Sequence, residues 1–171
     1  AGQLRNKAYC EHLDYVSQDF CEYQGSGDGI GLQNAEWDVS GIDIKSDIID
    51  IPLESSSFDF VLCTEVFEHI KYPEKALEEI YRLLKPGGNL ILTAPFCSLT
   101  HMAPFHMYSG FNRYWFKEVM TDTGFTKIEI EANGNWFDYM IQEIRRVPLM
   151  ARKYSGVKIG FFLKLAILPM L

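Results

Sequence analysis

The chain has 171 residues and a formal net charge of −7, from 16 Lys and Arg against 23 Asp and Glu. This length suffices for one domain with a sizeable core. Because its basic residues form no block, the composition argues against nucleic acid as the main partner, since phosphate binding needs a cationic surface. The four cysteines, Cys10, Cys21, Cys63 and Cys97, show no CxxC spacing. A protein of the reducing cytoplasm is therefore expected.

The first third of the chain predicts two strands joined by an irregular loop. A short helix is expected over residues 3–10, and a strand over residues 13–19 that ends in Asp19. Residues 24–41 are rich in Gly, Asn and Asp and predict a mobile surface insertion. No helix with a Lys-Ser/Thr step follows these glycines, so they do not indicate a phosphate cradle. The second strand is predicted over residues 42–48.

The strand predicted over residues 58–62 is apolar and aromatic, and polar residues follow it. In an open α/β sheet the carboxyl ends of the strands face the ligand crevice. Thr64, Glu65, Glu68 and His69 are therefore predicted to be crevice residues. The alternative is an ordinary strand followed by the solvent-exposed start of a helix.

A helix and a further strand come next. Apolar residues recur at helical spacing over residues 73–84, and Pro73 suits the first turn. Lys85-Pro86-Gly87-Gly88 should end this helix, because proline cannot continue it and glycine permits the turn. Residues 89–94 predict a buried strand. The order strand, helix, strand indicates a βαβ unit with parallel strands.

Residues 95–108 are rich in aromatic residues, Met and His, and prolines break them too often for a helix or long strand. This segment follows the carboxyl end of a strand, so it should lie over the crevice and contact the acceptor substrate. A neutral His101 or His106 could act as a general base. The two are five residues apart with no third ligand nearby, so no metal site is predicted. The alternative is that residues 95–108 form a lid over the crevice in which these side chains only pack.

The last third predicts two helices and an intervening strand. A helix is expected over residues 112–123, a half-exposed strand over residues 125–131, and a helix over residues 136–146 that Pro148 interrupts. The apolar residues 157–171 are too few for a bilayer span. They predict a docking helix, an interfacial helix with weak membrane or partner contact, or the start of a longer segment.

The sequence around residues 58–69, followed by residues 82–88 and 90–92, resembles the class I S-adenosylmethionine-dependent methyltransferases, in particular the small-molecule branch called type 11. In that branch a strand of the form F-D-x-V is followed by E-x-x-E-H, a helix and L-K-P-G-G. Here these read Phe58-Asp59-Phe60-Val61, Glu65-Val66-Phe67-Glu68-His69 and Leu84-Lys85-Pro86-Gly87-Gly88. The resemblance covers roughly residues 1–131. It implies a Rossmann-like, doubly wound α/β sheet with S-adenosyl-L-methionine as cofactor.

The resemblance also implies which residues contact the cofactor. Gly2 matches the last glycine of the cofactor turn, and Asp19 matches the acidic residue that accepts hydrogen bonds from the ribose hydroxyls. Asp47 and Ile48 match the pair at the adenine, with Asp50 as a competing match for Asp47. The Thr64-Glu65 region and His69 should line the methionine end of the cofactor site.

The resemblance implies methyl transfer to a small-molecule acceptor, with His106 and His101 handling the proton. One rival function is a non-catalytic domain that binds S-adenosylmethionine or S-adenosylhomocysteine, and another is a dinucleotide-dependent oxidoreductase. The chain opens without Met, so we expect a fragment in which residues 1–150 form a methyltransferase domain without its first strand and residues 151–171 form a tail. In this family the first strand lies between the second and the fourth. Here, therefore, those two strands close up, or a groove stays open between them, or the segment comes from a longer protein.

Overall fold

The computed structural model describes residues 7, 9–34, 36–156, 158 and 160. Gly2, most of the short helix expected over residues 3–10 and nearly all of the apolar tail lie outside these described residues. The chain divides into two compact units, residues 1–128 and residues 129–171. Among the described helices, none combines the length and the apolar character needed to cross a bilayer.

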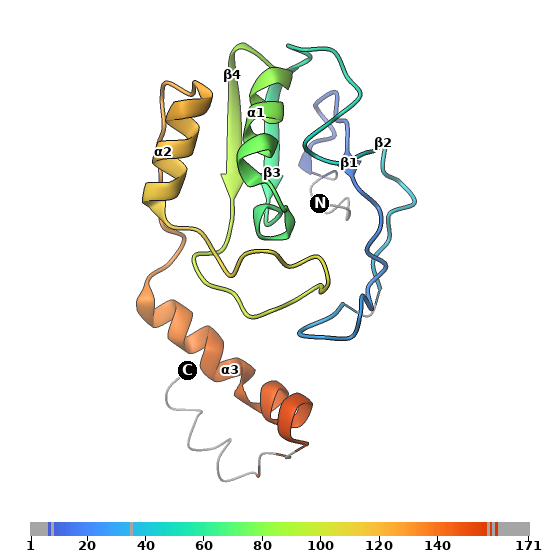
Figure 1. Cartoon of the computed structure of the whole chain (residues 1–171), viewed down its shortest axis with the longest axis vertical. Helices are drawn as coiled ribbons and strands as arrows, with labels where there is room; N and C mark the ends of the chain where they lie inside the picture. Colours follow the sequence, from blue (N-terminus) through green and yellow to red (C-terminus); the bar gives the residue numbers. More distant parts are fainter. Residues whose placement is uncertain (1–6, 8, 35, 157, 159, 161–171) are drawn as a thin grey trace. The chain divides into compact units, whose positions relative to one another are not determined.

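The best-formed part of the first unit is the predicted βαβ unit (Figure 1). Strand β3 spans Phe58–Thr64, helix α1 spans Pro73–Leu83 and strand β4 spans Leu84–Thr93. The two strands pair in parallel, with Thr64 opposite Thr93 at the carboxyl end. Helix α1 begins at Pro73 and ends before Lys85, as predicted. Strand β4 begins earlier than expected, because the Lys-Pro-Gly-Gly segment already continues in the strand.

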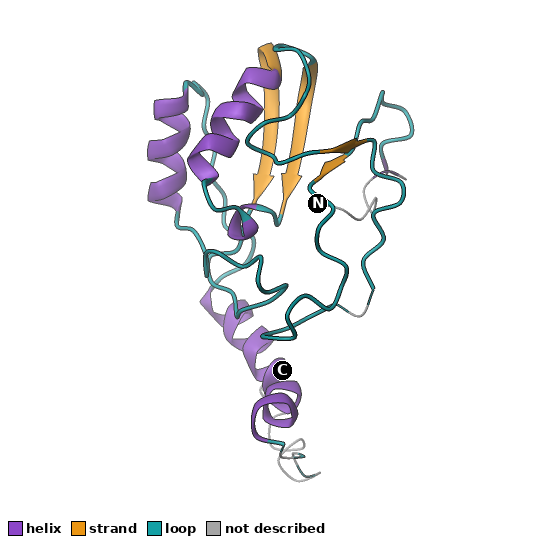
Figure 2. Cartoon of the chain, turned by 45° about the vertical axis from the view of Figure 1, so that its right-hand side comes forward, coloured by secondary structure: helices purple, strands orange, loops and turns teal. Residues whose placement is uncertain are grey.

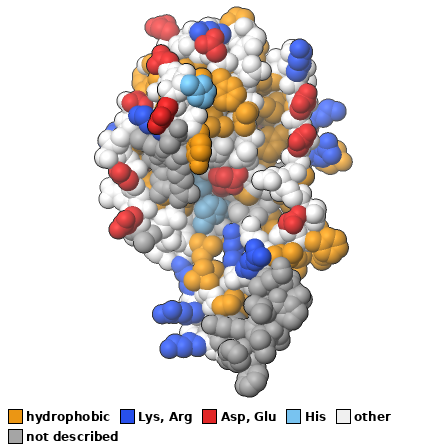
Figure 3. Space-filling model, turned by 180° about the vertical axis from the view of Figure 1, so that it is seen from behind, with side chains coloured by type: hydrophobic (Ala, Val, Ile, Leu, Met, Phe, Trp, Pro, Cys, Tyr) orange, Lys and Arg blue, Asp and Glu red, His pale blue; other side chains and the backbone are white. Residues whose placement is uncertain are grey.

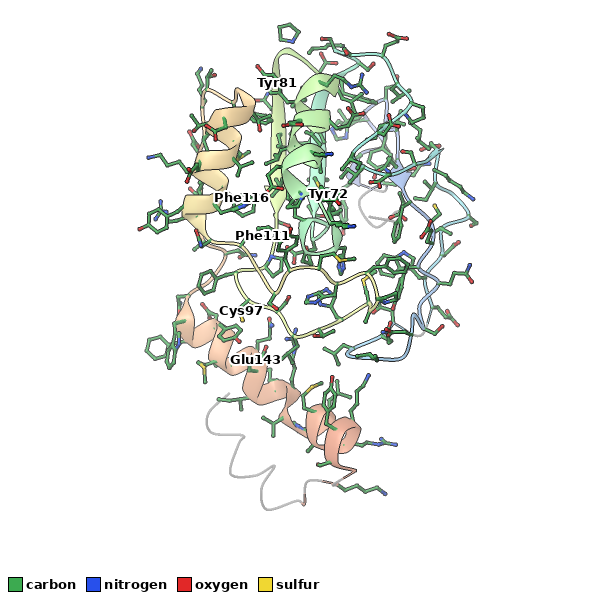
Figure 4. All side chains as sticks on the ribbon, viewed as in Figure 1. Tyr72, Tyr81, Cys97, Phe111, Phe116 and Glu143 are labelled. Carbon is green, nitrogen blue, oxygen red and sulfur yellow. The ribbon has the colours of Figure 1, made fainter. Side chains whose placement is uncertain are left out.

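The core of this unit lies between the sheet and two helices. The α1 side chains of Ala76, Leu77 and Ile80 are almost fully buried against Cys63 and Phe67. Helix α2, Arg113–Thr123, adds a second layer of apolar and aromatic side chains to the same cluster. Phe116 of α2 and Phe111, just before α2, lie near the lower end of that helix (Figure 4). Their ring centroids are 5.7 Å apart.

Helix α2 confirms the helix predicted from Asn112. The Asn112 side chain accepts hydrogen bonds from the backbone N–H groups of Tyr114 and Trp115, as an N-cap residue does. Gly124 follows the last turn in the left-handed conformation and donates to carbonyls of that turn. Both ends of this helix are therefore determined by local sequence.

Strands β1 and β2 are much shorter than predicted. They span Gln18–Asp19 and Ile44–Lys45, and they pair in parallel. Polar contacts extend this pairing by one residue at the start. The hydroxyl of Ser17 donates to Asp43 Oδ2 over 2.6 Å, and Asp43 N donates back to the same hydroxyl.

The parallel α/β class is confirmed, but the described strands form two separate pairs rather than one sheet (Figure 2). No described strand lies between β1 and β3. One face of β3 and β4 is covered by α1, whereas Phe60, Leu62 and Ile91 remain between 38% and 51% exposed. Figure 3 shows the molecule from the side opposite to Figure 1, and hydrophobic side chains gather on the upper part of this face.

Two predictions for the last third of the chain are wrong. Residues 125–131 form no strand, because no described strand pairs with them; Phe125 instead packs on the ring of Tyr81, 5.1 Å away. In the second unit, helix α3 spans Trp136–Ser155 and continues through Pro148. The proline removes one hydrogen bond of the helix without ending it. The boundary expected at residue 150 therefore falls inside a helix.

Candidate functional site

A cavity of about 890 Å³ lies in the first unit, lined by residues of both strand pairs and by the loops that follow them. Five of the seven predicted cofactor residues line it: Asp19, Asp47, Ile48, Glu65 and His69. Thr64 ends β3 and is not part of this lining, and Gly2 lies outside the described residues. The cavity corresponds to one of the alternatives stated above, an open groove between the family's second and fourth strands, which are β1 and β3 here.

Asp19 is the last residue of β1 and is only 7% exposed. Its Oδ1 atom accepts a hydrogen bond of 2.7 Å from the backbone N–H of Cys21, which orients the carboxylate. Both oxygens of a carboxylate accept hydrogen bonds. The next residue, Phe20, packs edge-on against Phe105 of the lid, with ring centroids 5.0 Å apart.

Asp47 and Ile48 lie on the loop after β2, which helix α1 holds in place. Glu79 Oε1 accepts from the backbone N–H of Ile51, and Arg82 donates to the carbonyl oxygens of Ile51 and Leu53. Ile48 packs against the main core cluster. Asp50, the competing match for the adenine contact, is not among the residues that line the cavity. This geometry favours Asp47 over Asp50.

The carboxyl end of β3 turns sharply at Glu65. This residue has a φ of 51°, which is uncommon for a residue other than glycine, and its backbone N–H still donates to Thr93 O. Its side chain accepts a hydrogen bond of 2.8 Å from the hydroxyl of Thr93. A 3-10 turn, η2, follows at Phe67–His69 and brings His69 to the cavity wall.

The lid, residues 95–108, is tied to η2 by its backbone. The N–H groups of Met107 and Tyr108 both donate to Glu68 O, and His69 Nδ1 lies 2.7 Å from Phe105 O. Met102, Phe105 and Met107 line the cavity together with the predicted cofactor residues. The lid therefore covers the crevice, as its place after β4 predicted.

The glycine-rich loop is not a free surface insertion. Its backbone forms two hydrogen bonds with the backbone of the lid. Leu32 N donates to Thr100 O, and Met102 N donates to Leu32 O. At Gly31, whose φ is 68°, a Cβ atom would lie 2.3 Å from Thr100 O. Glycine is required there because the loop backbone packs directly on the lid backbone.

The predicted bases His101 and His106 belong to the lid, and their rings lie close to the ring of His69. The ring centroids of His101 and His69 are 4.8 Å apart, and those of His101 and His106 are 4.7 Å apart. His106 Nε2 lies 3.1 Å from the hydroxyl of Ser98. Burial, followed by the proximity of His101, lowers the pKa of His106, so a neutral imidazole is favoured.

Glu68 is the residue of this cluster whose position the sequence did not predict. It was expected in the crevice, but only 1% of its surface is exposed, and burial raises its pKa to about 7. Burial likewise lowers the pKa of His69 to about 4. Sequence spacing offered no signal for this cluster, because 32 residues separate His69 from His101.

Known methyltransferases are among the proteins to which the chain is similar. A family model described as "Methyltransferase domain" matches residues 13–92, which include β1, β2, β3 and α1 and nearly all of β4. The chain is 27% identical over 105 residues to demethylmenaquinone methyltransferase of Chlamydia trachomatis, a match that covers 61% of this chain and 43% of that protein. It is 47% identical over 49 residues to an uncharacterized protein of Methanocaldococcus jannaschii, covering 29% of this chain and 21% of that protein.

Among solved structures, the chain is similar to phosphoethanolamine N-methyltransferase 2 of Haemonchus contortus in complex with S-adenosyl-L-methionine. The identity is 26% and the TM-score 0.48, over 73% of this chain and 31% of that one. The chain spans less than half the length of each of these relatives.

Proposed function

Since residues 13–92 form a methyltransferase domain of the class I, S-adenosylmethionine-dependent family, we propose that the protein transfers a methyl group from this cofactor to a small-molecule acceptor. The acceptor atom is a hydroxyl oxygen, an amine nitrogen or a carbon. A cytoplasmic location belongs to the same proposal and is supported by Cys10, Cys21 and Cys63, which form no disulfide in the described part of the chain.

The observation that carries the proposal is the convergence of five cofactor-type residues on one cavity. They come from four segments: the end of β1, the loop after β2, the end of β3 and η2. The carboxylate of Asp19 suits the two vicinal hydroxyls of a ribose, and Asp47 beside the apolar Ile48 suits an adenine ring. A cavity of about 890 Å³ is within the usual range for a cofactor site.

Methyl transfer requires the protein mainly to position the acceptor, to exclude water and to remove the acceptor's proton. The bound sulfonium supplies an already activated methyl group. The lid residues Met102, Phe105 and Met107 exclude water and hold the acceptor close, and such positioning contributes several kcal/mol to catalysis, on the order of 7–11 at best. His106 is the proposed proton acceptor, with His101 as the second candidate.

The cofactor assignment is tested by calorimetric titration of S-adenosylmethionine into the wild type and three variants. Asp19→Ala should weaken binding by about 1–3 kcal/mol, because it leaves ribose hydroxyls without an acceptor. Asp47→Ala should weaken binding as well, whereas Asp50→Ala should not, since Asp50 does not line the cavity. Equal affinity of the Asp19→Ala variant and the wild type would remove Asp19 from the cofactor site.

The catalytic assignment is tested by a screen of hydroxyl, amine and carbon acceptors that monitors release of S-adenosylhomocysteine. With any acceptor found, His106→Ala should lower kcat by about a hundredfold or more and leave cofactor affinity unchanged. If neither quantity changes, His106 only packs the lid. Tight binding of S-adenosylhomocysteine without turnover on any acceptor would favour a non-catalytic binding domain.

A further inference from the structure

Three potential metal ligands meet where the lid contacts η2. One ligand atom each from Glu68, His69 and His101 lies within 4.8 Å of the other two. Glu68 Oε1 is 3.7 Å from His69 Nε2 and 3.8 Å from His101 Nε2. These distances are too long for hydrogen bonds. The three groups therefore face one another without bonding directly.

The outer nitrogens of both imidazoles are already engaged. His69 Nδ1 lies 2.7 Å from Phe105 O, and His101 Nδ1 lies 2.9 Å from Leu99 O. A carbonyl oxygen can only accept, so the hydrogen of each neutral ring is assigned to Nδ1. The Nε2 lone pairs of His69 and His101 then point toward the carboxylate. A backbone carbonyl on the outer nitrogen is the usual support of a metal-binding histidine.

The carboxylate of Glu68 gives a second, independent indication. Its side chain is 2% exposed, and its Oε2 atom is buried without a hydrogen-bond partner among the described residues. A buried carboxylate that lacks a hydrogen-bonded partner or a counter-charge is strongly unfavourable. No Lys or Arg is paired with Glu68 in the described part of the chain. A bound cation would supply that missing charge.

We propose that Glu68, His69 and His101 bind a divalent first-row transition metal ion such as zinc. Two imidazole nitrogens and one carboxylate oxygen match zinc and iron, whereas calcium and magnesium prefer oxygen ligands alone. Zinc bonds of about 2.0–2.2 Å place tetrahedral ligand atoms about 3.4 Å apart. The distances of 3.7 and 3.8 Å from Glu68 to the two histidines are close to this value. All three ligand atoms lie within 4.8 Å of one another, so binding would draw the most separated pair closer together.

The metal would join the lid, through His101, to η2, through Glu68 and His69. His106 is not part of the ligand set, since its Nε2 faces Ser98, and it remains available to accept a proton. Three protein ligands leave a fourth position for water or for a heteroatom of the acceptor. The proposal stands independently of the methyl transfer proposed above, because it rests only on these three side chains.

The test is titration of zinc into protein stripped with a chelator, followed by calorimetry and by melting temperature. One ion per chain should bind and raise the melting temperature, as any ligand of the native state does. Cobalt in place of zinc should give the visible absorption of a site with nitrogen and oxygen ligands. His101→Ala should weaken binding by at least about tenfold.

Glu68→Gln should weaken binding as His101→Ala does, and it keeps the size of the side chain. The matched control is His106→Ala, which removes a neighbouring imidazole of the same cluster and should leave zinc affinity unchanged. If Glu68→Gln does not fold, His101→Ala alone decides, because its side chain lies on the lid. Absence of zinc binding to the wild type at micromolar metal would overturn the proposal, as would equal binding by the wild type and His101→Ala.

Discussion

The first unit contains two parallel strand pairs that are stabilised in different ways. In one, β3 and β4 have seven and ten residues, and helix α1 connects them. In the other, β1 and β2 have two residues each, and an irregular loop over residues 20–43 connects them. The first pair is stabilised by a helix that buries its apolar stripe, and the second by polar contacts and by a loop that packs on the lid.

The difference shows which part of the domain is a stable scaffold and which part depends on remote contacts. The apolar side chains of α1 are buried on the strands that precede and follow it, and α2 packs on the same core, so this pair is supported by elements close to it along the chain. The β1–β2 pair has no helix of its own among the described residues. It depends on Ser17, Asp43 and the distant lid, and it carries Asp19 and Asp47 into the cavity.

The largest expected loss of stability comes from the scaffold. Leu77 on α1 is fully buried, so Leu77→Ala should lower the free energy of unfolding by about 2–5 kcal/mol through lost contacts and a cavity. Urea denaturation followed by circular dichroism measures the loss. Glu78→Ala, next to it on an exposed side of the helix, is the control and should change little. A loss below about 1 kcal/mol at Leu77 would mean that α1 is not the main support of the sheet.

A smaller loss is expected where the loop packs on the lid. Gly31 and Gly29 both have a positive φ, but only at Gly31 would a Cβ meet backbone, 2.3 Å from Thr100 O. Gly29→Ala should cost about 1 kcal/mol from backbone strain alone, and Gly31→Ala about 2–4 kcal/mol.

The two glycine variants serve as matched controls for each other. Limited proteolysis of the lid should accelerate in the Gly31→Ala protein and not in the Gly29→Ala protein. Equal losses of stability would show that the contact between loop and lid contributes nothing to the second strand pair.

A modest, local effect is expected at the start of β1. Ser17→Ala removes the hydroxyl that donates to Asp43 and accepts from its backbone N–H, at a cost of about 1–2 kcal/mol. Hydrogen exchange at the amides of Ile44 and Ser46, which donate to the carbonyl oxygens of Ser17 and Asp19, should accelerate. Exchange in β4 should stay unchanged. Acceleration in both strand pairs would show that they unfold as one unit.

The smallest effect concerns pH. Hydrogen bonds from Ser17 lower the pKa of Asp43 below its ordinary value of 3.8. Stability from this carboxylate is therefore present above pH 3.8 and is lost as pH falls through the lowered pKa of the folded state. Asp43→Asn cannot titrate, so its urea midpoint should fall less than that of the wild type between about pH 5 and pH 3. Parallel curves for the two proteins would contradict this role of Asp43.

Sequence alone predicted the parts of the fold that depend on neighbours along the chain. The βαβ unit was predicted because its apolar residues recur at the right spacing, Pro73 suits the start of the helix and Lys85-Pro86-Gly87-Gly88 does not continue it. Helix α2 was predicted through Asn112 and Gly124, which cap it directly. The strand expected at residues 125–131 does not form, because alternation requires a partner strand that the described chain does not provide there.

The candidate site was predictable only where a residue's place follows from the end of a strand. Asp19, Asp47 and Glu65 reach the cavity because each lies near the carboxyl end of a predicted strand. The meeting of Glu68 with His101 depends on how the lid folds back over η2. No local pattern encodes that contact.

The tight backbone contacts of the lid have a consequence for how this domain tolerates sequence change. A Cβ at Gly27 would lie 2.0 Å from Ala103 O, and one at Gly110 would lie 2.1 Å from Phe96 O. Neither glycine lines the cavity. In a saturation-mutagenesis map scored by growth, both positions should nevertheless reject every substitution as strictly as a catalytic residue. Intolerance at these two positions would report the shape of the lid rather than the chemistry beneath it.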